Sequence, residues 1–198
     1  VGRTQELRAL RRLLADPVVR LITLTGPGGI GKTRLALQTA AERIDFHLAG
    51  VWFIGLTPVD DGADVVPALM EALQIPAIHA DNPWPALSGY LRSRDILLVL
   101  DDFEHVLTPR NVETVARLLA SAATLRIVVT SRARLQLQAE QVVEIDGLPY
   151  PTPADMTPAT DFAAIQLFTR RARQQDAAFD LSPQALATVA HICRAVGG

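Results

Sequence analysis

The sequence predicts an α/β fold in which a parallel β-sheet is covered by helices on both faces. Short aliphatic runs of strand length alternate along the chain with segments whose apolar residues recur at helical spacing. These runs are apolar throughout instead of alternating with polar residues, as expected for strands buried on both faces. With 198 residues, of which 49% are hydrophobic, the chain can bury one sizeable core and carry a smaller appendage.

The elements follow one another in a regular order. Strands are expected at residues 21–25, 51–56, 96–100, 125–130 and 141–145. The helices expected between them are residues 34–44, 65–73, 84–91 and 112–122. Beyond the strands, only helices are expected, at residues 162–173 and 183–195.

A proline-rich segment separates the two parts of the chain. Residues 147–158 contain four prolines, a composition typical of a linker. We therefore expect an α/β domain over residues 1–150, a linker over 151–158 and a partial helical subdomain over 159–198. Because the first residue is Val1 instead of Met, we also expect the chain to be a fragment of a longer protein.

Composition narrows the functional class. The net charge of −2 and pI of about 6.1 show no basic bias, so direct nucleic-acid binding is not expected. Cys193 is the only cysteine, which excludes an internal disulfide and favours a reducing compartment such as the cytoplasm. The apolar runs are too short to span a bilayer, and no signal peptide is recognisable.

A glycine-rich segment between the first expected strand and the first expected helix has the pattern G-x-x-x-x-G-K-[ST]. Its glycines allow backbone N–H groups to turn toward phosphate oxygens, and the helix N-terminus adds a favourable dipole. Lys32 is expected to bridge the β- and γ-phosphates, and the Thr33 hydroxyl is expected to ligate magnesium. The expected nucleotide-binding residues of this loop are Gly26, Pro27, Gly28, Gly29, Ile30, Gly31, Lys32, Thr33 and Arg34.

Lysine usage supports this prediction. Lys32 is the only lysine, whereas the chain has eighteen arginines. A compact ammonium on a flexible stem fits between phosphates better than a planar guanidinium does. A GC-rich genome would explain the many arginines, but it does not explain the single exception.

Two aspartates follow the third expected strand directly. The carboxyl ends of parallel strands share the edge of the sheet at which ligands bind. Asp101 is therefore expected to hold magnesium, directly or through water, and Asp102 to orient or deprotonate an attacking water. The alternatives are that both cap the following turn, or that Glu104 is the base. His105 is expected to pack on the following helix.

The fourth expected strand ends in Thr130-Ser131-Arg132 at the same edge. Because a guanidinium forks onto phosphate oxygens, Arg132 is a candidate to contact the γ-phosphate and report its presence. The alternative, which composition favours equally, is a surface arginine in a polar loop. The expected catalytic residues are thus Lys32, Asp101, Asp102 and Arg132, and the expected metal ligands are Thr33 and Asp101.

Together these motifs resemble the STAND class of P-loop NTPases, and specifically the NB-ARC-like ATPase domains of bacterial LuxR-type and AfsR-type regulators. The loop resembles the family's Walker A motif, residues 97–105 its Walker B motif, and residues 129–132 its sensor-1 segment. Val1-Gly2-Arg3 resembles the hydrophobic-Gly-Arg motif that lies over the adenine, so Val1 and Arg3 join the expected nucleotide-binding residues. Residues 147–149, 164–168 and 192–194 resemble later landmarks that are weak on their own.

The resemblance implies a five-stranded sheet of order 5-1-4-3-2 and a switch driven by ATP and ADP. In such proteins ADP lies between the sheet domain and a helical domain, and its exchange for ATP permits self-association. Hydrolysis is slow, and the switch controls an attached effector, often a DNA-binding domain. Relatives continue after the final Gly-Gly with Leu-Pro-Leu-Ala, whose proline packs on the adenine. Because this chain stops at Gly198, part of the nucleotide pocket and the effector and sensor domains are expected in a longer protein.

Other functional classes remain as alternatives. A scaffold that binds ADP without hydrolysis differs from the switch mainly in whether Asp102 acts as a base. A small-molecule kinase would need an acceptor pocket and an arginine-rich lid, which the apolar, proline-rich region around Trp84 does not suggest. A DNA-loading AAA+ ATPase would need a sensor-2 arginine, for which Arg170, Arg171 and Arg173 are candidates by position only.

Two aromatic residues of the second expected strand, Trp52 and Phe53, are expected in the core.

Overall fold

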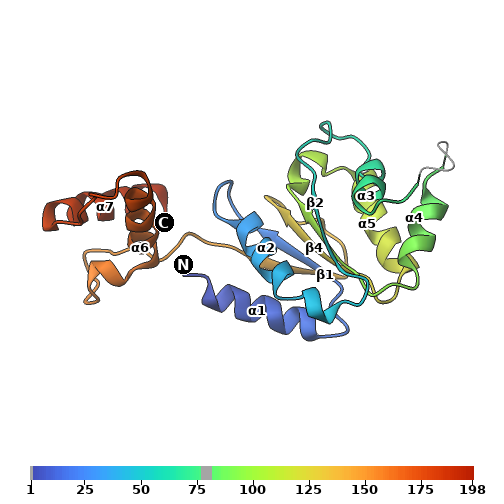
Figure 1. The fold of residues 1–198 in the computed structure, drawn as a ribbon, viewed down its shortest axis with the longest axis horizontal. Coiled ribbons are helices and arrows are strands. Elements are labelled where there is room, and N and C mark those ends of the chain that lie inside the picture. Colours follow the sequence, from blue (N-terminus) through green and yellow to red (C-terminus); the bar gives the residue numbers. More distant parts are fainter. Residues whose placement is uncertain (1, 77–81) are drawn as a thin grey trace. The chain divides into compact units, whose positions relative to one another are not determined.

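A computed structural model of the chain describes residues 2–76 and 82–198 and divides it into two compact units (Figure 1). The larger unit is Leu7–Ile145, and the smaller combines the residues up to Glu6 with Asp146–Gly198. The expected nucleotide-binding residue Val1 lies outside the described residues. The expected domain boundaries, 1–150, 151–158 and 159–198, stay a prediction.

The larger unit is built on a five-stranded parallel sheet. Its strands are β1 (Leu21–Thr25), β2 (Val51–Gly55), β3 (Leu97–Asp101), β4 (Arg126–Ser131) and β5 (Glu140–Glu144). They lie in the order β2-β3-β4-β1-β5, and every neighbouring pair is parallel. The predicted fold class and strand order are confirmed. Each predicted strand agrees with the structure to within one residue at either end.

Two apolar clusters cover the two faces of the sheet, and strand β3 contributes to both. Leu98 and Leu100 belong to one cluster, whereas Leu97 and Val99 belong to the other. Successive side chains of β3 point to opposite faces of the sheet. Because both faces are covered, all five residues of the strand are buried. This double burial explains why the first four residues of the strand, Leu97–Leu100, are all aliphatic.

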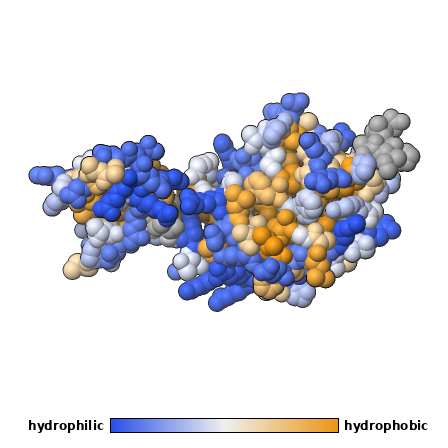
Figure 2. Space-filling model, in the orientation of Figure 1, coloured by the Kyte–Doolittle hydropathy of each residue, from blue (hydrophilic) through white to orange (hydrophobic). Residues whose placement is uncertain are grey.

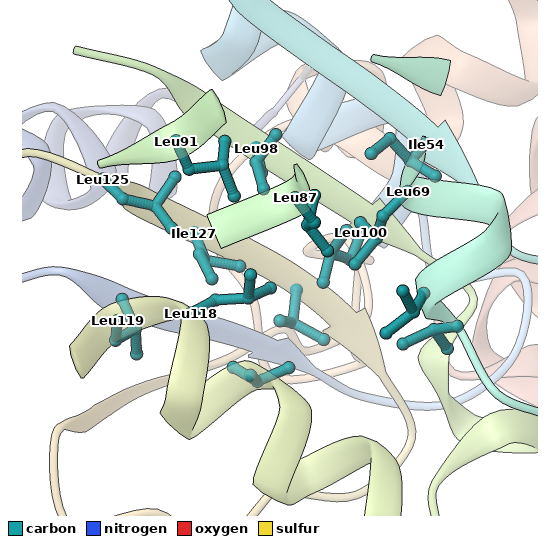
Figure 3. Packing of buried hydrophobic residues seen from close by; sticks show 14 of the residues in the cluster. Ile54, Leu69, Leu87, Leu91, Leu98, Leu100, Leu118, Leu119, Leu125 and Ile127 are labelled. Atoms are coloured by element: carbon teal, nitrogen blue, oxygen red, sulfur yellow. The ribbon is translucent and has the colours of Figure 1, made fainter. Parts of the chain in front are cut away.

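Helices α3 (Val66–Ala72), α4 (Trp84–Leu91) and α5 (Pro109–Ser121) cover one face. Figure 3 shows their leucines packed against the strands, with Leu69 from α3, Leu87 and Leu91 from α4, and Leu118 and Leu119 from α5. Helices α1 (Thr4–Ala15) and α2 (Lys32–Ala41) contribute to the cluster on the other face. Helix α1 was not predicted, although Leu7, Leu10 and Leu14 recur at helical spacing there.

The predicted helix at residues 34–44 begins and ends earlier than expected. Helix α2 starts at Lys32, inside the glycine-rich segment, and ends at Ala41 before a short 3-10 helix, η1 (Ile44–Phe46). Arg11 on α1 joins the end of α2 through two hydrogen bonds from its guanidinium to Glu42, of 2.7 and 2.8 Å. These hydrogen bonds lower the pKa of Glu42 to about 2.

The expectation that Phe53 lies in the core is wrong. Its strand, β2, is at the edge of the sheet, and Phe53 is 39% exposed. Trp52 is partly buried against the larger cluster, and its indole N–H donates to the carbonyl of Ala49 at 3.2 Å. Figure 2 shows apolar surface on the larger unit around α2 and β2, where Leu37 and Phe46 are also exposed.

The smaller unit is helical, as predicted. After a short 3-10 helix, η3 (Ala159–Asp161), it consists of α6 (Ala163–Gln175) and α7 (Pro183–Val196). Gly2 packs against α6 with a φ of +74°, and a Cβ there would collide with the Cβ of Ala163. Arg3 lies in the same unit and pairs with Glu6 at 2.6 Å. The need for glycine at position 2 is therefore a packing requirement of this unit.

Candidate functional site

The glycine-rich segment connects β1 to α2 as a loop that ends at a helix N-terminus. Gly31 is the N-cap residue of α2, with a φ of +100°, and its carbonyl accepts a hydrogen bond from the N–H of Leu35 at 2.9 Å. Gly29 also has a positive φ, of +77°, and neither glycine has atoms near the position of a Cβ. The loop therefore has the backbone conformations and the open space that a bound phosphate chain requires.

Lys32 is buried at the base of this loop. Its Nζ donates to the carbonyl oxygens of Gly26 at 2.9 Å and Pro27 at 3.0 Å. The side chain is thus folded into the loop, where its ammonium contacts two backbone carbonyls. Contact of Lys32 with the β- and γ-phosphates stays a prediction.

Asp101 and Asp102, at the end of β3, have different surroundings. Asp101 is 5% exposed, and its Oδ1 accepts a hydrogen bond of 2.6 Å from the hydroxyl of Thr130 on β4. The same hydroxyl accepts a hydrogen bond of 3.0 Å from the backbone N–H of Asp102. Thr130 therefore ties the ends of β3 and β4 together. In the sequence, the only sign of this role is that Thr130 is a polar residue directly after the aliphatic run of β4.

Asp102 has a left-handed backbone conformation, with φ of 58° and ψ of 48°. It is the N-cap residue of the short 3-10 helix η2 (Phe103–Val106), but its side chain makes no capping hydrogen bond. Instead, Oδ2 accepts a hydrogen bond of 2.9 Å from the hydroxyl of Thr57, just after β2. Residues other than glycine rarely adopt this conformation. Those that do are found disproportionately at functional sites. Sequence analysis did not identify Thr57.

Glu104 and Arg132 form an ion pair near the loop. The Arg132 Nε lies 3.2 Å from Glu104 Oε1, and the other carboxylate oxygen, Oε2, is buried without a hydrogen-bond partner. The guanidinium also lies over Gly28, where a Cβ would be 3.1 Å from its terminal nitrogen. His105 was expected to pack on the next helix. The structure shows a different contact, in which its Nε2 lies 2.9 Å from the carbonyl oxygen of Leu56.

A cavity of about 590 Å³ brings most of the predicted residues together. The residues that line it are Gly28, Gly29, Gly31, Lys32, Thr33, Arg34, Leu37, Asp102, Glu104 and Arg132. Asp101 is buried beneath this surface and does not line it. Arg3 and the three α6 arginines belong to the smaller unit. The cavity therefore combines the phosphate loop with the polar ends of β3 and β4.

The side chains near the loop fit a magnesium ion of the kind that phosphates help to hold. No group of three or more His, Cys, Asp or Glu residues that could hold a metal occurs in the described residues. Magnesium at such sites needs only one or two protein ligands, with phosphate oxygens and water as the others. The suitable donors are the Thr33 hydroxyl and the Asp101 carboxylate, which accepts the Thr130 hydrogen bond through Oδ1.

Comparison with known sequences finds relatives along the chain. The model of the NB-ARC domain matches residues 3–144. An uncharacterized protein of Mycobacterium tuberculosis is 35% identical over all 198 residues, which make up 47% of that protein. A second protein of that species, whose name describes an HTH-type transcriptional regulator, is 31% identical over 96% of this chain and 20% of its own length. The chain thus spans about half, or less, of these relatives.

Solved structures share the fold. A STAND protein with a tetratricopeptide repeat sensor from Pyrococcus horikoshii matches the whole chain, with a TM-score of 0.55 and 18% identity over 28% of its own length. Cdc6p from Pyrobaculum aerophilum matches 75% of the chain, with a TM-score of 0.57 and 22% identity over 45% of its own length. The resemblance inferred from the motifs is confirmed.

None of the described helices has the length and apolar character that crossing a membrane requires.

Proposed function

The chain belongs to the NB-ARC family, and from this we propose that it is the ATP- and ADP-binding switch domain of a longer signalling or transcriptional regulator. In this proposal it hydrolyses ATP slowly with Mg²⁺, and the exchange of ADP for ATP changes its conformation and self-association. One observation carries the proposal. A single cavity is lined by the phosphate loop, by Asp102 and Glu104 after β3, and by Arg132 after β4. These are the groups that phosphoryl transfer to water requires.

Each group has a distinct task in this proposal. The loop N–H groups and the α2 N-terminus bind the phosphate chain, and Lys32 moves from the loop carbonyls to phosphate oxygens. Magnesium, held by Thr33 and Asp101, would neutralise charge on the β- and γ-phosphates. Asp102 accepts a proton from the attacking water, and Arg132 stabilises negative charge on the γ-phosphate.

The wider functions are proposed from the relatives and from the family resemblance. The matched relatives are at least about twice as long as this chain, which leaves room in the whole protein for effector and sensor domains. Arg3 and Val1 are the proposed contacts on the adenine side. Self-association in the ATP state and a cytoplasmic location belong to the same proposal, as does the absence of direct nucleic-acid binding by this part.

A scaffold that binds ADP without hydrolysis is the second candidate. It is favoured by the fact that the side chains proposed to act on the attacking water and on the γ-phosphate charge already have other partners. Asp102 accepts a hydrogen bond from Thr57, and Arg132 pairs with Glu104. In this case ATP would bind without turnover, and the domain would act through ADP alone.

Thr57 is a proposed positioning residue because its hydroxyl holds Asp102 Oδ2. Replacing Thr57 with Val keeps the side-chain shape but removes the donor. We expect kcat for ATP hydrolysis to fall about three- to tenfold with KM unchanged, since the carboxylate then samples other orientations. Thr57→Ser, which keeps the hydroxyl, should retain the wild-type kcat. This role would be contradicted if kcat fell equally in Thr57→Val and Thr57→Ser. It would also be contradicted if KM fell equally in both.

The nucleotide that remains bound during purification tests the proposed function. Protein purified without added nucleotide is denatured, and the released small molecules are separated and identified by chromatography and mass spectrometry. We expect to recover ADP, in an amount of up to about one molecule per chain, because the proposed switch rests in its ADP state. Recovery of GDP would overturn the adenine assignment. If no nucleotide is recovered and neither ADP nor ATP binds in titration, the switch proposal itself fails.

A further inference from the structure

The ion pair between Glu104 and Arg132 lies in the cavity that the phosphate loop opens into. Both side chains line that cavity, and Arg132 also lies against Gly28 of the loop. The side chain of Arg132 is 68% exposed, so it can change direction without disturbing the core. The side chain of Glu104 is only 22% exposed and has much less freedom. The pair therefore joins an exposed side chain, which is free to reorient, to a largely buried one, which is not.

Among the described residues, Arg132 is the hydrogen-bond donor to the Glu104 carboxylate. Oε1 faces the Arg132 Nε, whereas Oε2 is buried and has no partner in the described structure. The Glu104 side chain is only 22% exposed, so losing its donor costs more than it would for a fully solvated carboxylate. Any ligand that draws Arg132 away would leave this carboxylate unpaired next to the ligand's own negative charge.

We propose that Glu104 sets the preference of the site for ADP over ATP by holding Arg132 away from the γ-phosphate. This inference rests on the proposed function, because it concerns the same nucleotide site. ADP, whose phosphates reach only the loop and Lys32, leaves the ion pair intact. ATP adds a phosphate beyond them, where it competes with Glu104 for the guanidinium. The ion pair therefore opposes ATP and leaves ADP unaffected.

The expected size of this effect is moderate. Exposed ion pairs contribute little because water screens them, and Arg132 is the exposed partner. The low exposure of the Glu104 side chain, 22%, raises the cost of separation above that of an ordinary surface pair. We therefore expect Glu104 to weaken ATP binding about three- to tenfold relative to ADP binding.

Glu104→Gln tests the proposal because it removes the charge and keeps the shape. Dissociation constants for ADP and for the non-hydrolysable analogue AMP-PNP are measured with Mg²⁺ on the whole chain by titration calorimetry. The variant should bind AMP-PNP about three- to tenfold more tightly than the wild type, with the ADP constant unchanged. Glu113→Gln, which removes an exposed carboxylate on α5, is the matched control and should change neither constant.

A second background separates an effect through Arg132 from direct repulsion of the phosphate. In Arg132→Gln protein, adding Glu104→Gln should no longer change the ratio of the two dissociation constants. The proposal is overturned if the single variant leaves that ratio unchanged, or if the change persists without Arg132. Neither result would touch the proposed function, which fails only if the wild type binds no adenine nucleotide.

Discussion

Lys32→Ala is expected to weaken the binding of both ADP and ATP by about a hundredfold or more. The wild-type ammonium can make charge-assisted hydrogen bonds to two phosphate oxygens, and each such bond is worth more than a neutral one. In the proposed mechanism Lys32 leaves the carbonyls of Gly26 and Pro27 when it contacts phosphate, so the loss falls on the nucleotide-bound state. Titration with fluorescent ADP measures the change.

Two controls make this result specific. Arg12→Ala removes one positive charge from an exposed position on α1 and should leave both affinities unchanged. Lys32→Arg keeps the charge, but its planar guanidinium fits the loop poorly, so we expect much of the loss to remain. Binding of Lys32→Ala at wild-type affinity would show that the phosphates do not lie in this loop. A circular dichroism spectrum like that of the wild type excludes misfolding as the cause.

Asp102→Asn is expected to lower the rate of ATP hydrolysis about a hundredfold or more while leaving nucleotide affinity unchanged. The amide cannot accept the proton of the attacking water, but it can still accept the hydrogen bond from the Thr57 hydroxyl. The local geometry is therefore kept while the chemistry is removed. Phosphate release in a single turnover measures the rate even if the wild-type enzyme is slow.

The outcome separates the two candidate functions. Asp61→Asn, at an exposed carboxylate after β2, is the matched control and should hydrolyse ATP at the wild-type rate. If Asp102→Asn keeps the wild-type rate, Asp102 is not the base, and Glu104 is the next residue to test. If the wild type itself releases no phosphate although it binds ATP, the scaffold candidate is favoured over the switch.

The sheet and the loop could be predicted because their signals are local. The two faces of β3 are both covered, so Leu97–Leu100 are all aliphatic, and with Ile96 they form an apolar run of five consecutive positions. The phosphate loop needs glycines at fixed positions for its backbone conformation, and these too lie within one short segment. Asp101, Asp102 and Arg132 could be added because parallel strands end at a shared edge.

The contacts around these residues could not be predicted in the same way. Thr57 and Asp102 are 45 positions apart, and Glu104 and Arg132 are 28 apart. Nothing near either residue in the sequence indicates its partner. Phe53 was assigned to the core because it lies in an apolar strand, and only the position of β2 at the edge of the sheet leaves it exposed.

The sequence by itself determined which chemistry is predicted for the site. The loop, its single lysine and the acidic end of β3 predict a place for phosphates and magnesium, because each motif requires particular residue types at short spacing. The tertiary structure alone decided how these groups are held at rest. Lys32 is bound to its own loop, Asp102 to Thr57 and Arg132 to Glu104. These pairings depend on the order of the strands, which brings distant residues to one edge of the sheet.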